Sequence, residues 1–274
     1  MNILRKKFRY IDIFIKYTVV LLKSNLQYRL NAVFLSLGIF IREMVNVVIV
    51  YLMFKKIDEI NGWNFYEVIF LYSLLYVSYG LLIGIFAGVR DFSRLVQRGE
   101  LDRYLVRPLP ILFQVVTSGA DYFTSIANMV AGIGLLTFSI SHIEIVWTFI
   151  NVVYLIITII SGVMIQLALF ILIDSLTIWA VKADGIRTIL FFNIKRFAGY
   201  PISIFPSLLK IILMYIIPFA FVNYFPAQFF LNKGDMSAFP SYLPLLSPIL
   251  GLGSIIITLL LWKVSIRKYN STGN

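Results

Sequence analysis

Six long apolar stretches constrain the fold of this chain more than any other feature. They cover residues 31–54, 65–89, 111–140, 145–181, 202–222 and 242–262. An apolar run of about 18 residues or more is long enough to cross the hydrocarbon core of a bilayer as a helix. The pattern therefore predicts an all-α integral membrane protein with six transmembrane helices. A composition of 60% hydrophobic and 14% charged residues excludes an ordinary soluble domain.

Positive charges are unevenly distributed among the segments between these stretches. The N-terminal tail carries seven Lys and Arg residues, the second loop five, the fourth loop four and the C-terminal tail three. The other three loops carry only Lys55, Lys56 and Lys233. Because basic residues accumulate on the cytoplasmic side of membrane proteins, both termini and the second and fourth loops are predicted to be cytoplasmic. In such a protein the basic excess indicates contact with membrane lipids rather than with nucleic acid.

Residues 1–30 form a separate N-terminal segment before the membrane domain, which covers residues 31–274. Its apolar residues recur at helical spacing, at Phe8, Ile11, Ile15, Val19, Leu22, Leu26 and Leu30. Lysines and arginines are scattered among them. This pattern predicts an amphipathic helix that lies along the inner membrane surface. A solvated basic tail is the alternative.

A densely charged loop follows the second apolar stretch. Eight of the 18 residues from Arg90 to Arg107 are charged. Arg90, Arg94 and Arg98 stand four residues apart and so share one helical face. Gly99 suits the left-handed position that ends such a helix. We therefore expect a short amphipathic cytoplasmic helix and a turn here. The residues alone leave open whether the arginines contact a partner or only anchor the topology.

Residues 98–115, RGELDRYLVRPLPILFQV, resemble a loop of bacterial ATP-binding-cassette (ABC) transporter permeases that have the ABC type-2, exporter-like six-span membrane domain. Residues 199–206, 217–227 and 267–273 agree with this family in order and spacing. The resemblance implies a permease subunit in the bacterial cytoplasmic membrane. Such a subunit takes part in ATP-driven export of a hydrophobic or amphipathic compound, such as a drug, an antimicrobial peptide or a lipid-like molecule.

The resemblance also assigns a partner to the charged loop, residues 90–110. In such permeases this loop is a coupling helix that docks into a groove of a cassette-type ATPase subunit. Carried over to this chain, the coupling residues are Arg90, Asp91, Arg94, Arg98, Gly99, Glu100, Asp102, Arg103 and Arg107.

The chain has no Gly-x-x-x-x-Gly-Lys-Ser/Thr phosphate loop. We therefore expect no cofactor on this chain and assign ATP and Mg²⁺ to the partner ATPase. The chain itself is expected to be a transport subunit rather than an enzyme. One six-span chain forms half of the usual twelve-helix pathway, so a second permease, identical or homologous, is implied.

Polar residues within the apolar stretches are candidates for the transport route. Arg42 and Glu43 lie near the middle of the first stretch, where a charge costs about 2.5–3.5 kcal/mol on insertion scales, and Asn46 follows one turn later. They are predicted to line the pathway; a mutually satisfied structural cluster is the alternative. The resemblance further implies a partly re-entrant outer segment at about residues 223–241, with Pro218, Asn223 and Pro226 at an outer gate.

Two other functional classes remain to be weighed. An ion- or proton-driven secondary carrier would favour inverted repeats and several mid-membrane carboxylates, yet no repeat is visible and Glu43 alone lies near a midpoint. An integral membrane enzyme would need a cluster of catalytic side chains at one membrane face. With one histidine, His142, and no cysteine, the sequence offers no catalytic or metal site.

Overall fold

The computed structural model describes residues 3–27, 29–178, 184–233, 240 and 242–269. Their regular secondary structure is helical, apart from one isolated bridge between Ile60 and Trp63. Five helical stretches of the described chain are long and apolar enough to cross a membrane, and a bent pair would supply a sixth. The predicted all-α membrane architecture is thereby confirmed.

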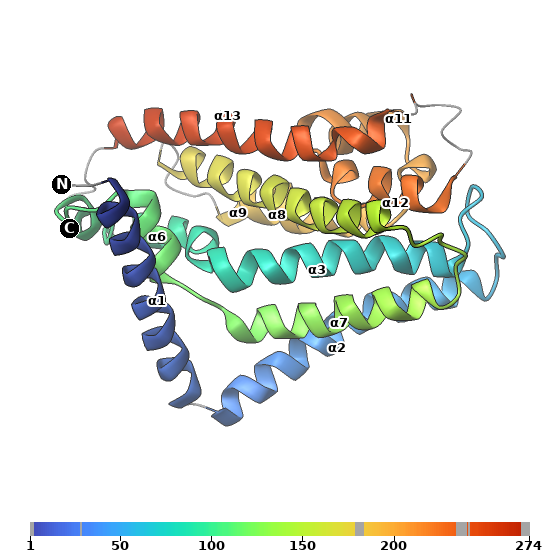
Figure 1. The fold of residues 1–274 in the computed structure, drawn as a ribbon, viewed down its shortest axis with the longest axis horizontal. Helices are drawn as coiled ribbons and strands as arrows, with labels where there is room; N and C mark the ends of the chain where they lie inside the picture. The colour runs from blue at the N-terminus through green and yellow to red at the C-terminus, as the bar shows by residue number, and fades with distance from the viewer. Residues whose placement is uncertain (1–2, 28, 179–183, 234–239, 241, 270–274) are drawn as a thin grey trace.

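The long stretches follow the predicted order along the chain. They are α2 (Arg29–Phe54), α3 (Phe65–Arg90) with its extension α4 (Phe92–Gln97), α7 (Tyr122–Ile140), α8 (Phe149–Thr177) and α13 (Ser247–Arg267). Figure 1 shows these helices running roughly along the long axis of the molecule. Helices α8 and α13 lie on one side of α3, and helices α2 and α7 lie on the other.

Helix α3 is the buried axis of the bundle, because most of its residues are buried. Asn64 begins the helix with a capping box: its side chain accepts from the Glu67 N–H, 3.1 Å away, and Glu67 accepts from the Asn64 N–H at 2.8 Å. Near its other end, Phe86 departs from helical geometry, with φ −120° and ψ 23°. We call the two ends of the bundle the Phe65 end and the Arg90 end.

Small residues let α3 approach its neighbours closely. The Ser125 hydroxyl of α7 donates to the Gly80 carbonyl at 2.8 Å. The Gly88 N–H donates to the Gly119 carbonyl at 3.2 Å. In membranes, where apolar side chains gain little from mutual contact, such close backbone approach is a main source of helix association. The spacing of Gly80, Gly84 and Gly88 therefore serves helix packing.

The prediction of one continuous helix over residues 111–140 is wrong, because the chain leaves the helical conformation near Gly119. The structure divides this stretch into α6 (Ile111–Ser118) and α7, joined by an extended segment at Gly119 with φ −140° and ψ 136°. Asp121 then caps α7, because its carboxylate accepts from the Thr124 N–H at 3.0 Å. The sequence prediction missed this break because it depends on the contact of Gly119 with Gly88 of α3.

The segment after α8 also differs from the expected loop. It forms α9 (Asp184–Arg187), the π-helical η1 (Thr188–Asn193) and α10 (Ile194–Ala198). Phe191 stacks on Phe170 of α8, with ring centroids 4.2 Å apart, and lies 5.9 Å from the ring of Tyr79. The segment therefore packs into the bundle beside α3 and α8, and a water-exposed loop is the wrong description of it.

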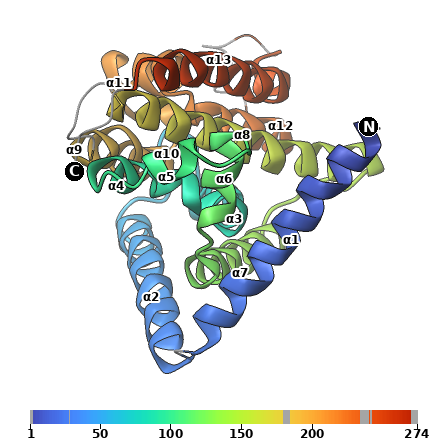
Figure 2. The same ribbon diagram turned by 90° about the vertical axis from the view of Figure 1, so that its left-hand side faces the viewer.

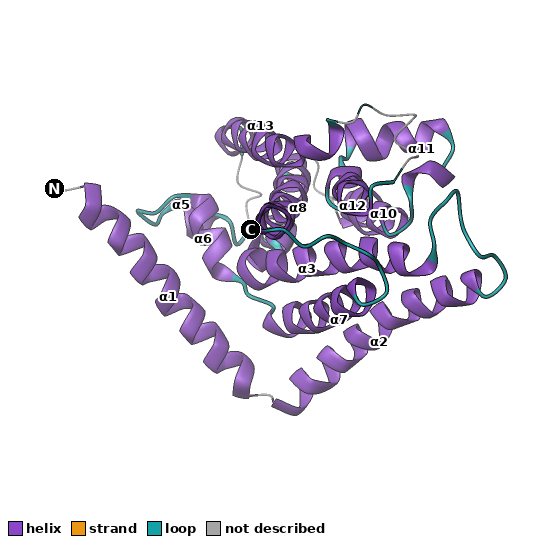
Figure 3. Cartoon of the chain, turned by 45° about the vertical axis from the view of Figure 1, so that its right-hand side comes forward, coloured by secondary structure: helices purple, strands orange, loops and turns teal. Residues whose placement is uncertain are grey.

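The fifth predicted stretch, residues 202–222, is not one straight helix. After η2 (Ile202–Ile204), the chain forms α11 (Ser207–Ile211) with η3 (Ile212–Ile216), and then η4 (Phe219–Phe221) with α12 (Tyr224–Leu231). The two halves, 207–216 and 219–231, are bent by 70°. Pro218 at the bend has no N–H with which to continue the helix. Figures 1 and 3 place both α11 and α12 toward the Phe65 end, and η6 (Leu243–Leu246) then leads into α13.

Helix α1 (Ile3–Gln27) forms a V with α2 and stands apart from most of the bundle (Figure 2). Its ring contact is Tyr10 on Phe113 of α6, at 5.0 Å. Ile11, Ile15 and Val19 remain exposed. These side chains belong to the apolar stripe on which the interfacial placement was predicted, and lipid would cover them. The placement itself and the cytoplasmic position of both termini stay predictions.

Substitution of these glycines tests directly whether close backbone contact stabilises the bundle. Replacing Gly88 by alanine should lower the free energy of unfolding by roughly 1–3 kcal/mol, because the new Cβ would overlap the carbonyl oxygen of Val115. Gly134→Ala on α7 is the matched control, since an added Cβ there meets nothing within 4 Å. Thermal unfolding of both variants in one detergent measures the difference, and equal melting temperatures would contradict this account.

Candidate functional site

Two adjoining pockets lie between α2, α3 and the segment α9–α10. The larger, which we call the tyrosine cavity, has a volume of about 620 Å³, and the smaller, the arginine pocket, about 440 Å³. Arg42, Tyr79 and Phe192 line both. The tyrosine cavity lies halfway along α2 and α3, and the arginine pocket lies next to it toward the Arg90 end.

The three polar residues predicted on the first stretch share the wall of the tyrosine cavity. Arg42 donates to one Glu43 carboxylate oxygen from Nη2 at 2.6 Å and from Nε at 3.2 Å. Asn46 Nδ2 donates to the Arg42 carbonyl at 3.4 Å. Glu43 is buried, whereas the Arg42 side chain is 62% exposed. A charge pair on adjacent residues thus faces an open space in the middle of the bundle.

Lys195 of α10 is one of the residues of this site that sequence reasoning missed. Its ammonium lies 3.3 Å from the ring centroid of Tyr79 and 5.7 Å from that of Tyr76. Charge counting placed Lys195 in the fourth loop, which is wrong, because the side chain is buried in the bundle. The apolar run Ile189–Phe192 just before it was the available signal, since such a run suits a packed helix better than a loop.

Four tyrosines line the tyrosine cavity, and they are Tyr72, Tyr76, Tyr79 and Tyr200. The first three share one face of α3, because their spacing follows the helical repeat. The Tyr76 hydroxyl donates to the Glu43 carbonyl at 3.4 Å and so joins α3 to α2. Gly199 lies against the ring of Tyr72, where a side chain would overlap it. The cavity therefore has aromatic walls with hydroxyl groups among them.

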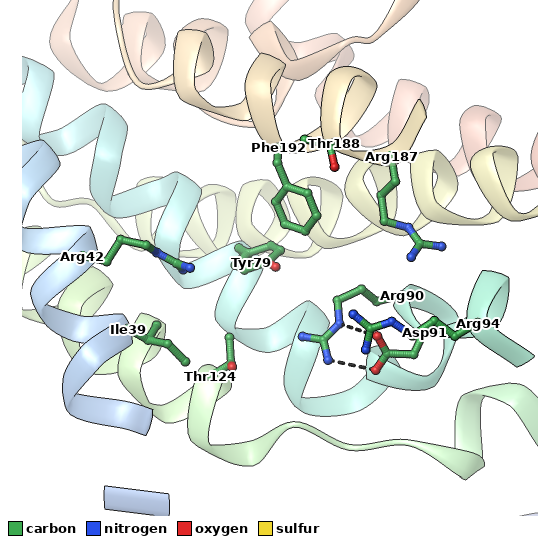
Figure 4. Close-up of a pocket in the computed structure, with 10 residues that line it drawn as sticks. All are labelled: Ile39, Arg42, Tyr79, Arg90, Asp91, Arg94, Thr124, Arg187, Thr188 and Phe192. Atoms are coloured by element: carbon green, nitrogen blue, oxygen red, sulfur yellow. Dashed lines mark hydrogen bonds and ion pairs between the residues drawn. The ribbon is translucent and has the colours of Figure 1, made fainter. Parts of the chain in front are cut away.

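The arginine pocket holds an ion-pair network around Arg90 (Figure 4). Arg90 donates to both carboxylate oxygens of Asp91, at 3.1 and 2.9 Å, and to Asp121 at 2.9 Å. Burial raises the pKa of the Asp121 carboxyl, but hydrogen bonds from Thr124 and Arg90 outweigh it and hold this pKa below its ordinary value. Arg90 and Asp91, both predicted to contact an ATPase, thus also join the end of α3 to the start of α7.

A second ion pair fixes α9 to α8. Arg187 Nη2 lies 2.9 Å from Asp174 Oδ1, and both side chains are almost fully buried. A buried pair of this kind costs much to break, because either charge left alone would be unpaired inside the bundle. The pair sets where the segment α9–α10 begins, and so where Lys195 lies relative to α3.

The charged loop has the predicted shape. Gly99, with φ +67°, ends α4 in the left-handed conformation. The Glu100 N–H donates to the Leu95 carbonyl at 2.9 Å and the Gly99 N–H to that of Val96 at 3.1 Å, a Schellman motif. A second short helix, α5 (Asp102–Leu105), follows.

The loop packs its apolar side chains inward and leaves arginines outside. Phe92, Val96 and Leu101 are buried. Glu100 and Asp102 are half-buried. Exposed at this end are Arg94, Arg98, Arg103 and Arg107, which we call the arginine surface. Figure 2 shows α4, α5 and α6 together at the Arg90 end.

The residues predicted at an outer gate lie near the bend before α12. Asn223 is fully buried and donates to the Leu71 carbonyl at 3.2 Å and to the Ala198 carbonyl at 2.7 Å. It therefore ties α3, α10 and the start of α12 together. Pro218 stands at the bend, and Pro226 lies in the first turn of α12, where no backbone N–H is needed for a helical hydrogen bond. A gating role for the three stays a prediction.

Comparison with protein families now adds to the geometry. A family model described as ABC-2 family transporter protein matches residues 40–273. The chain belongs to the ABC-2 family. No curated protein and no solved structure matches the chain significantly. As an ABC-2 permease the chain is a multi-pass membrane subunit for transport, of a kind that works with ABC ATPase subunits.

Stability measurements can distinguish an arginine that holds the fold together, Arg90, from an exposed arginine, Arg94. Arg90→Gln should lower the free energy of unfolding by about 1–3 kcal/mol, because Asp91 and Asp121 lose charged hydrogen bonds. Arg94→Gln, one helical turn later and exposed, should leave stability unchanged within about 0.5 kcal/mol. Thermal or denaturant unfolding in detergent measures both. Similar losses for the two variants would show that Arg90 is not the structural arginine of the pair.

Proposed function

We propose that this ABC-2 permease moves a hydrophobic or amphipathic compound outward across the bacterial cytoplasmic membrane, driven by ATP hydrolysis on a separate ATPase subunit. The observation that carries the proposal is the arginine surface, which projects from the Arg90 end of the bundle on two short helices. The family match supports it, because ABC-2 membrane domains work with ABC ATPases.

The arginine surface suits docking to an acidic groove. Arginine offers several fixed N–H donors that bind carboxylates in bidentate pairs. Leu105 and Val106 are exposed beside these arginines, Val106 at 84%, which provides an apolar contact within a charged rim. Arg107 also lies over the Tyr104 ring at 5.6 Å. This combination of arginine with apolar and aromatic groups is typical of protein interfaces.

The docking loop is firmly connected to the bundle. Gln114 of α6 donates to the carbonyls of Tyr104 and Leu109, at 2.9 and 2.8 Å. Leu101 is fully buried beneath the loop. Because these contacts fix α5 on α6, movement of a docked ATPase would move α4, α5 and α6 together. ATP binding would close two such ATPases, with their Mg²⁺, and draw together the loops of this permease and of a second permease.

Charge reversal of the arginine surface tests this coupling. The double variant Arg98→Glu/Arg103→Glu should weaken association with the ATPase at least about tenfold, because attraction to acidic groups becomes repulsion. Lys56→Glu, an exposed charge reversal in the loop between α2 and α3, is the matched control. The measurements are the ATPase recovered with the purified chain, identified by its phosphate loop, and the rate of ATP hydrolysis in proteoliposomes.

Two results would count against the proposal. Unchanged assembly and hydrolysis in the double variant would remove the docking role of these arginines. Substrate transport by the chain alone, driven by an ion gradient without ATP, would favour the secondary-carrier alternative.

A further inference from the structure

We propose that the tyrosine cavity binds the anionic headgroup of an amphiphile, with Lys195 as its principal cation. This inference rests on the proposed function and specifies the chemical class of its substrate. The ligand class is a phosphate or carboxylate group that carries a hydrocarbon tail.

The first support is the charge balance of the cavity. Three cationic side chains line it, from Arg42, Lys195 and Arg196, against the single carboxylate of Glu43. Arg42 already makes two hydrogen bonds to one oxygen of that carboxylate. The remaining positive charge of Lys195 and Arg196 exceeds what Glu43 can neutralise, so the cavity presents a net positive potential to whatever enters it.

The second support is the state of Lys195 itself. The residue is only 9% exposed, and no described residue accepts a hydrogen bond from its ammonium. The ammonium opens onto the cavity, so its three N–H donors can reach a bound ligand, and leaving them without acceptors in this largely apolar setting is costly. Contact with the Tyr79 ring offsets part of that cost, but a ring face is a weaker partner than an oxygen anion. An anion in the cavity would supply the missing acceptors.

Depth in the membrane strengthens this reasoning. Lys195 lies against Tyr76 and Tyr79, halfway along α3. At that depth a charged side chain is expensive and generally marks a substrate pathway. Glu43 interacts electrostatically with Lys195 across the cavity. The competing account is therefore a structural Arg42–Glu43–Lys195 cluster, which the experiment below separates from a binding site.

The walls of the cavity suit an amphiphile rather than a small hydrated ion. Rings of Tyr72, Tyr76 and Tyr200 pack well against hydrocarbon, and the Tyr200 hydroxyl offers a donor to an anion. Leu75 and Val45 add apolar surface. A volume of about 620 Å³ falls within the range of about 300–1,000 Å³ typical of small-molecule sites.

Neighbouring surfaces provide places for the tail and a route for the headgroup. On α2, Val48, Ile49 and Leu52 are exposed on the turns that follow the cavity. Toward the Arg90 end the cavity adjoins the arginine pocket, which is lined by Arg42, Arg90, Arg94 and Arg187 and by one carboxylate, that of Asp91. Figure 4 shows these arginines around one opening between α2, α3 and the segment that begins at α9. An anionic headgroup would meet more cations than carboxylates along this path, while its tail stayed in contact with apolar helix surface.

The test is ligand binding by the isolated full-length chain in dodecyl maltoside, without any ATPase. Dodecyl phosphate is the probe, and dodecyltrimethylammonium, with the same tail and opposite charge, is its control. Binding is followed by the rise in melting temperature with ligand concentration and by native mass spectrometry of the bound species. We expect saturable stabilisation by dodecyl phosphate and none by the ammonium compound.

Variants then locate the site. Lys195→Met keeps the side-chain length but removes the charge, and should weaken dodecyl phosphate binding about tenfold or more, as expected for lost charged hydrogen bonds. Lys210→Gln removes a lysine charge on α11, outside the cavity, and should bind as the wild type does. Tyr200→Phe, which removes one hydroxyl only, should weaken binding less than Lys195→Met.

Several results would overturn the inference. They are equal stabilisation by the ammonium compound, unchanged binding in Lys195→Met, and binding of inorganic phosphate alone as tight as that of dodecyl phosphate. A Lys195→Met protein that loses stability but binds normally would identify the structural cluster. Because no ATPase is present, any of these results would leave the coupling experiment on Arg98 and Arg103 unaffected.

Discussion

The close approach of α3 to α6 and α7 is the contact on which the rest of the structure depends. Gly80, Gly84 and Gly88 bring the helix backbones together on one face of α3. Tyr72, Tyr76 and Tyr79 occupy a neighbouring face of the same helix and point to α2 and α10. The packing of one face thus sets the position of the other. A shift of α3 relative to α7 would move the tyrosine wall of the cavity by the same amount.

Sequence reasoning succeeded where the physical cause is local. Gly99 ends α4 because a left-handed residue is needed there, and Arg42 meets Glu43 because the two are adjacent in a span. It failed where the cause lies elsewhere in the chain. Gly119 breaks the third stretch by packing against Gly88, a contact that no window of sequence around residue 119 reveals.

Lys195 illustrates the limit of charge counting for a candidate site. Basic residues between apolar stretches are assigned to loops because most of them lie there. Arg187 and Lys195 instead enter the bundle on a helical segment that the Arg187–Asp174 pair holds in place. The apolar run Ile189–Phe192 indicates a packed helix, but the depth of these side chains depends on a tertiary ion pair between α8 and α9. As a result, sequence reasoning singled out the polar residues of α2 that line the cavity, and not those of α3 and α10.

The departure of Phe86 from helical geometry has a mechanical consequence. It divides α3 into a long part toward the Phe65 end, with the tyrosines, and a short part toward the Arg90 end that continues into α4. Arg90 belongs to the short part and forms an ion pair with Asp121 at the start of α7. A displacement applied at α4 would therefore act on two helices, α3 and α7. The Arg90–Asp121 salt bridge would transmit it to the start of α7, and the irregular turn at Phe86 would let the short part of α3 change its angle to the long part.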